Sequence, residues 1–247
     1  MAPGADGPAA RRSGAAQLPL AFRCPPDQRL EAYLRAPAGA IGLLRALARG
    51  EAGDWPYLAG VSGTGKTHLA LAVCAEAQAA GRSAAYLPLA AAAGRVREAL
   101  QAREAQQLLA LDGVEALAGR RDDELALFEF HNRARAAGVA VLYTAAAAPD
   151  ALPLALPDLR SRLAQCTRIV LAPLDDEGRR EVLRDRARRR GLVLESGALD
   201  WLLRHRGRDL AGLTAALDRL DRASLAAQRR VTLPFLREVL EDGGARP

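Results

Sequence analysis

The sequence predicts an α/β fold, with a core built on a five-stranded parallel sheet and a small all-α domain after it. Three observations predict this. A glycine-rich phosphate loop joins an apolar strand to a helix. Apolar strands then alternate with helices, which is typical of a parallel sheet covered on both faces. Beyond Pro173 only helical patterns follow, so we predict a flexible tail at 1–24, a nucleotide-binding core at 25–172 and a helical lid at 173–247.

The elements of the core follow from short apolar runs and amphipathic stretches. The predicted strands are 57–59, 84–89, 107–111, 139–144 and 167–171. The predicted helices are 27–34, 38–49, 66–80, 95–103 and 122–136. In the last of these helices we count Leu125, Phe128 and Ala136 among the apolar positions.

The lid is predicted from four helical patterns in succession. They span residues 175–190, 196–206, 209–228 and 233–241. Asp175, Ser196 and Asp209 are the expected N-caps, because a short polar side chain there accepts a backbone N–H of the first turn.

The composition narrows the class of protein. Half of the 247 residues are hydrophobic, but no apolar run is long enough for a membrane span, and residues 1–16 lack the apolar stretch of a signal peptide. Three cysteines and three histidines are scattered, which favours a reducing cytosol and indicates neither a disulfide framework nor a zinc site. The net charge of +6 is compatible with nucleic acid, although an arginine-rich composition alone produces such a charge.

The phosphate loop carries the most specific chemistry. The predicted nucleotide-binding residues are Gly60, Val61, Ser62, Gly63, Thr64, Gly65, Lys66 and Thr67. Lys66 is the only lysine among 35 lysine and arginine residues, and it stands where a slim cation must reach the β- and γ-phosphates. The Thr67 hydroxyl is the expected Mg²⁺ ligand of ATP or ADP.

Asp112 ends the apolar run LLALD and is the second predicted Mg²⁺ ligand, although a strand-terminal Asp can also be a turn residue. Related ATPases commonly place a water-polarising acid at the next position, where this chain has Gly113. Glu115 is close, but the offset of two residues changes its direction. The sequence therefore predicts weak intrinsic hydrolysis.

The segment Gln17–Phe22, QLPLAF, is similar to the peptides that dock on the bacterial sliding clamp. In such a peptide Leu18, Leu20 and Phe22 supply apolar contacts, and Gln17 bonds at the rim of the pocket. The alternative is an N-terminal segment that packs on the core.

Four motifs together resemble one family. The phosphate loop, LLALD, LPDLRSRL and RDLAGLTAALDRL occur in the order of the AAA+ domain of the replication initiator DnaA, over about residues 25–247. The stretch LDRLDRASLAAQRRVTLPFLREVL further resembles the Hda-type regulatory inactivators within the DnaA-like AAA+ family.

The resemblance implies roles for single residues. Arg162 matches the arginine finger, a cation inserted into a neighbouring protein's nucleotide site, with Arg160 as the second choice and a plain surface arginine as the alternative. Arg208 matches the lid arginine that reaches the γ-phosphate, with Arg206 next. Thr144 either retains part of the polar sensor role or caps its strand.

The resemblance also implies a function. The expected protein docks on the DNA-loaded sliding clamp of DNA polymerase III and stimulates ATP hydrolysis by DnaA, so that initiation is not repeated. Its own site then holds ADP or ATP as a switch. We expect a cytoplasmic, nucleoid-associated protein, able to form a homo-oligomer, that reaches DNA mainly through the clamp. The alternatives are an autonomous DNA-stimulated ATPase, such as a helicase loader, and a plain DNA-binding protein.

Overall fold

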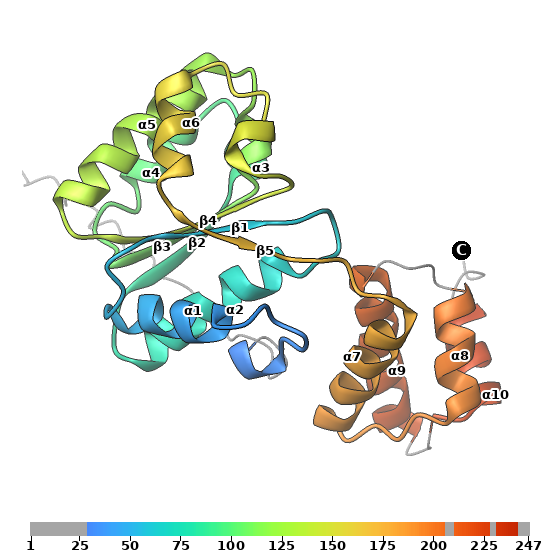
Figure 1. Ribbon diagram of the computed structural model, residues 1–247. Helices are drawn as coiled ribbons and strands as arrows, with labels where there is room; N and C mark the ends of the chain where they lie inside the picture. The colour runs from blue at the N-terminus through green and yellow to red at the C-terminus, as the bar shows by residue number, and fades with distance from the viewer. Residues whose placement is uncertain (1–28, 206–209, 228–230, 242–247) are drawn as a thin grey trace, which may run out of the picture.

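The computed structural model describes residues 29–205, 210–227 and 231–241, and contains an α/β core followed by a helical lid (Figure 1). All sheet pairings are parallel, in the strand order β2-β3-β4-β1-β5. The strands are β1 Pro56–Ala59, β2 Ala84–Pro88, β3 Leu108–Asp112, β4 Ala140–Ala145 and β5 Thr167–Val170. The predicted fold class is confirmed.

Helices cover both faces of the sheet. Helices α1 and α2 lie on one face, and α3 to α6 lie on the other (Figure 1). The core helices are α1 Ala40–Arg49, α2 Lys66–Ala79, α3 Leu89–Ala92, α4 Val96–Gln101, α5 Arg121–Ala136 and α6 Pro157–Ala164. Short 3₁₀ turns are η1 Leu30–Ala32, η2 Val114–Leu117 and η3 Pro149–Ala151. The central strands are mostly apolar, with Asp112 and Thr144 near their carboxyl ends, as expected for strands buried on both faces.

The lid has its own hydrophobic core, separate from that of the sheet. Its helices are α7 Asp176–Arg189, α8 Ser196–His205, α9 Leu210–Ala227 and α10 Leu233–Glu241. Asp175 caps α7 as predicted, since its carboxylate accepts the N–H of Gly178. Arg35, which precedes α1, forms ion pairs with Asp175 and Glu181 at 2.9 and 3.0 Å and so ties the core to the first lid helix.

Several local expectations were wrong. Within the described part of 27–34 only the 3₁₀ turn Leu30–Ala32 forms, and the helix expected at 95–103 is limited to Val96–Gln101. Leu125 lies on the outer side of α5 with 39% of its surface exposed, because the core-facing positions are one and two residues later. Ser196 is the first residue of α8 and not its cap.

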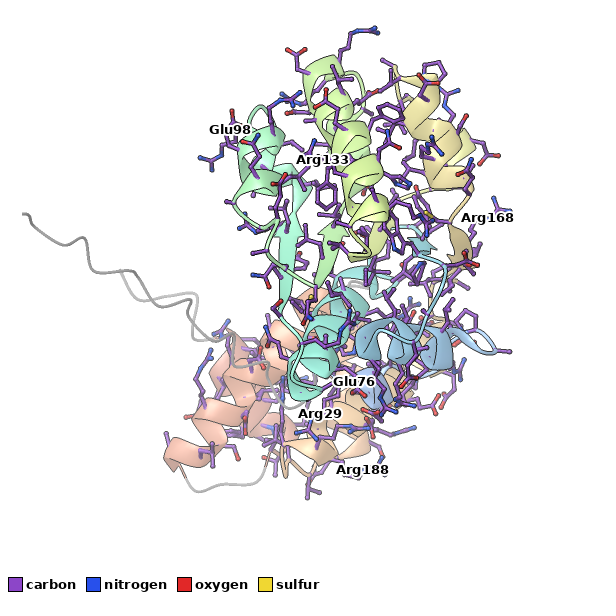
Figure 2. The ribbon with its side chains drawn as sticks, turned by 90° about the vertical axis from the view of Figure 1, so that its left-hand side faces the viewer. Arg29, Glu76, Glu98, Arg133, Arg168 and Arg188 are labelled. Atoms are coloured by element: carbon purple, nitrogen blue, oxygen red, sulfur yellow. The ribbon has the colours of Figure 1, made fainter. Side chains whose placement is uncertain are left out.

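Charged side chains lie on the outside of these layers. Figure 2 labels Glu98 on α4, Arg133 on α5 and Arg168 on β5, all of them exposed. Many surface arginines are paired with acids, as in Arg133 with Glu104 at 3.0 Å. Such exposed pairs contribute little to stability, about 0–1 kcal/mol each. None of the helices in the described ranges is both long and apolar enough to cross a membrane.

Candidate nucleotide site

The phosphate loop runs from the carboxyl end of β1 to the first residue of α2, Lys66. Gly63 and Gly65 have φ of 81° and 87°, in the left-handed region that favours glycine. At Gly60 the reason for glycine is space, because an added Cβ would lie 2.7 Å from the carbonyl oxygen of Leu171 and from Thr64 Oγ1. The loop is therefore a tight backbone turn at a helix N-terminus, the geometry that binds phosphate oxygens.

The lysine of the loop turns back onto the backbone. Lys66 Nζ donates to the carbonyl oxygens of Gly60 at 2.6 Å and Val61 at 3.0 Å. Burial lowers the pKa of Lys66, and the negative charges of Glu115 and Asp112 oppose that shift. Asp112 lies at the end of β3 and Glu115 in the turn η2, so both carboxylates act on the ammonium group from outside the phosphate loop.

Asp112 is the centre of a hydrogen-bond network. Its Oδ2 accepts the hydroxyls of Thr67 and Tyr86, both at 2.7 Å, and its Oδ1 accepts the hydroxyl of Thr144. Thr144 Oγ1 in turn accepts the N–H of Gly113 at 3.1 Å. The structure brings together the two predicted metal ligands, Thr67 and Asp112, whose oxygens are of the kind that Mg²⁺ prefers.

Thr144 does not cap its strand, because β4 continues to Ala145 and the side chain is fully buried. Its hydroxyl holds the Asp112 carboxylate in place. Elsewhere in the described ranges, no three His, Cys, Asp or Glu side chains gather as a metal site. A Mg²⁺ ion here would therefore use Thr67, Asp112 and the phosphates of a nucleotide.

Arg162 lies far from this loop, near the amino end of the sheet. Its helix, α6, leads into β5, whose first residue Thr167 donates its N–H to the Trp55 carbonyl at 2.9 Å, just before β1. Arg162 is exposed, and its side chain has no ion pair or hydrogen bond within the described residues. Arg160, by contrast, is half-buried and donates to the Leu154 carbonyl at 2.5 Å.

Some predicted site residues lie outside the described ranges. They are the clamp-peptide residues Gln17, Leu18, Leu20 and Phe22, and the lid arginines Arg206 and Arg208. Their roles stay predictions.

Two family models match the chain in succession. Residues 56–171 match the ATPase family associated with various cellular activities, AAA, and residues 176–240 match the lid domain of Hda. The chain is a Hda/DnaA-like AAA+ protein. The two matches meet between β5 and α7, where the parallel sheet gives way to helices.

Solved structures have the same fold. Domain III of the DnaA protein of Thermotoga maritima has 21% sequence identity and a TM-score of 0.69, covering 88% of this chain and 97% of that one. AMPPCP-bound DnaA from Aquifex aeolicus has 21% identity and a TM-score of 0.66, covering 89% and 70%. The RuvB branch migration motor of Thermotoga maritima is more distant, with 18% identity and a TM-score of 0.57, covering 81% and 65%.

Sequence reasoning missed two residues of this AAA+ site. Tyr86 on β2 binds Asp112, and its pKa is raised by burial and by that carboxylate. Tyr33 donates its hydroxyl to the Thr64 carbonyl at 2.7 Å and packs so close that a Cβ on Gly65 would lie 2.6 Å from its ring. Burial raises the pKa of Tyr33 to about 12. The sequence did contain a signal for Tyr86, namely a tyrosine near the carboxyl end of the strand that pairs with LLALD.

A third missed residue, Glu124, holds the connection that leads to α6. This carboxylate is fully buried in the first turn of α5. It accepts the N–H groups of Gly119 at 2.9 Å, Ala155 at 3.0 Å and Leu156 at 2.7 Å. Three backbone donors satisfy the buried charge, and the start of α6 is fixed as a result.

Proposed function

We propose that this protein is a regulatory inactivator of replication initiation, which stimulates ATP hydrolysis by the initiator DnaA through Arg162. The supporting observation is the contrast between its two arginine candidates. Arg162 is exposed and has no side-chain partner in the described structure, whereas Arg160 is bonded to the backbone of its own chain. A finger must be free to enter another protein's site, and Arg162 meets that condition.

The position of Arg162 supports action in trans. The phosphate loop follows the carboxyl end of β1, while α6 leads into the amino end of β5, a parallel neighbour of β1. Arg162 therefore lies toward the amino ends of the strands, opposite to the nucleotide site of the same chain. A cation supplied to a phosphoryl-transfer site from a neighbouring protein accelerates hydrolysis by about 10³–10⁵-fold.

The protein's own site is proposed to bind ADP or ATP with Mg²⁺ as a switch. Lys66, Thr67 and Asp112 retain the binding apparatus, and Gly113 leaves no acid directly after the Walker B aspartate. The proposed partners are DnaA and the DNA-loaded sliding clamp, which the QLPLAF segment would bind, and the proposed place of action is the nucleoid. The Hda-type lid and the DnaA-like core are the reasons for this choice of partners.

The experiment measures hydrolysis of DnaA-bound ATP on clamp-loaded DNA. We expect Arg162→Ala to reduce the stimulation by about 10³-fold, because the transition-state charge loses its external cation. Arg160→Ala is the matched control and should retain most of the stimulation. Full stimulation by Arg162→Ala would remove the finger assignment.

Clamp docking is tested separately by Gln17→Ala combined with Phe22→Ala, with clamp binding as the readout. Unchanged clamp affinity would contradict the docking proposal. Rapid DNA-stimulated hydrolysis by the isolated protein, lost in Lys66→Ala, would instead favour an autonomous ATPase.

A further inference from the structure

The residue after Asp112 changes the direction of the chain. Gly113 has φ of 87°, and the 3₁₀ turn η2, Val114–Leu117, begins directly after it. An extended continuation of β3 would have carried the following residues beyond the sheet. The left-handed glycine and the tight turn instead keep Glu115, three residues after Asp112, at the carboxyl end of the strands.

Glu115 has an unused carboxylate oxygen there. Its Oε2 is buried and has no hydrogen-bond partner in the described structure. Leaving a buried acceptor unpaired is unfavourable, and more so for a charged group. Such an atom is free to accept a hydrogen bond from a further donor.

The surroundings of Glu115 belong to the nucleotide site. Its negative charge acts on Lys66 of the phosphate loop, ahead of that of Asp112, and on Tyr57 of β1. The Tyr57 hydroxyl does not satisfy Glu115, because it donates to the Ala147 carbonyl at 2.9 Å. The carboxylate of Glu115 is therefore electrostatically coupled to the lysine of the phosphate loop.

Asp112 is not available for the same task. Its two oxygens already accept three hydroxyl groups, from Thr67, Tyr86 and Thr144. A carboxylate so occupied is a positioned ligand. Glu115 is the other acid acting on Lys66, and its oxygen is free.

We propose that Glu115 is the general base for slow ATP hydrolysis at this chain's own site, in place of the acid that Gly113 lacks. The inference rests on the proposed nucleotide site and extends it. In the step, a water oxygen bonds to the γ-phosphorus and the bond from the γ-phosphorus to the β,γ-bridging oxygen breaks. ADP leaves with that electron pair, the water proton passes to Glu115, and the products are ADP and inorganic phosphate. Hydrolysis then sets how long the switch stays in its ATP state.

The test is single-turnover conversion of radiolabelled ATP by the isolated full-length protein. We expect slow conversion by the wild type and a loss of about 10²-fold or more in Glu115→Gln, the range of general-base catalysis. Affinities for ATP and ADP and the thermal midpoint should stay near the wild-type values. Asp150→Asn is the matched control, because Asp150 is an exposed acid that also acts on Tyr57 at this edge, and it should keep the wild-type rate.

Three results would overturn the proposal. They are absence of conversion by the wild type, an unchanged rate in Glu115→Gln, and a rate that falls only because nucleotide affinity falls with it. The failure of the proposed function looks different. ADP-loaded Glu115→Gln should still stimulate DnaA through Arg162. Absence of stimulation by the wild type would therefore refute the finger and leave the role of Glu115 unaffected.

Discussion

The carboxyl edge of the parallel sheet, where its strands end, differs in construction from the amino edge, where they begin. At the carboxyl edge the polar side chains bind one another or the backbone, as Lys66 and Asp112 do. At the amino edge Arg162 is exposed without a side-chain partner in the described structure, and its charge acts on the buried His131, which packs against Trp55 and Tyr143. A binding site is formed by side chains that are held in place. A group that acts on another protein must instead stay accessible, while the helix that carries it is held rigid.

The largest effect is expected at the carboxyl edge, from Lys66. Lys66→Ala and Lys66→Arg should both weaken ADP and ATP binding by roughly 10²-fold, because about 3 kcal/mol of charged hydrogen bonding is lost or misplaced. Arginine fails since its planar group does not fit where a single ammonium bonds to the Gly60 and Val61 carbonyls. Titration with a fluorescent nucleotide measures this. Wild-type affinity in Lys66→Arg would mean that any cation is sufficient.

The second effect belongs to Glu124, which fixes the start of α6, the helix that carries Arg162. Glu124→Ala leaves the N–H groups of Gly119, Ala155 and Leu156 without their acceptor, so we expect about 2–3 kcal/mol less free energy of unfolding. Stimulation of the partner should fall because the start of α6 loosens, while nucleotide affinity stays unchanged. Denaturant unfolding and the DnaA assay measure the two effects.

Glu129→Gln is the control for Glu124. It removes a partly exposed acid from the same helix. The only ion pair of Glu129 in the described structure is with Arg97, so the change should alter stability by less than about 1 kcal/mol. Equal losses in both variants would show that the two carboxylates are equivalent and that the buried network is unimportant.

The sequence predicted the sheet because most of its strands are short apolar runs between turn signals. It predicted the phosphate loop because contact with phosphate requires the glycines and the lysine of that motif. It did not predict Tyr33, Tyr86 or Glu124. Each of these acts through a contact between residues 26 to 32 positions apart in the chain, except for the nearer bond to Gly119. Local patterns carry no such information. The error at Leu125 has the same origin, because which side of α5 faces the sheet depends on packing.

The smallest effect is a pH dependence of stability that arises at the amino edge. His131 is buried, shares a hydrogen bond with Tyr143 Oη at 3.0 Å and meets the edge of Trp55 at 4.8 Å between ring centroids. Burial, followed by the positive charges of Arg135 and Arg162, lowers the pKa of His131 from 6.5 to about 4. The native protein therefore keeps His131 neutral where the unfolded chain binds a proton.

The sign follows from that difference. The contribution of His131 is fully present above pH 6.5 and is lost as the pH falls toward about 4, because the unfolded state takes up the extra proton. At 1.36 kcal/mol for each unit of pKa, about 3 kcal/mol is lost across this window. Denaturant unfolding of the wild type and of His131→Gln between these pH values isolates the contribution of His131, since the carboxylates titrate in both proteins. Parallel curves would exclude a buried neutral histidine. A smaller loss in Arg162→Ala than in the wild type would show that the exposed charge of Arg162 acts on the buried His131.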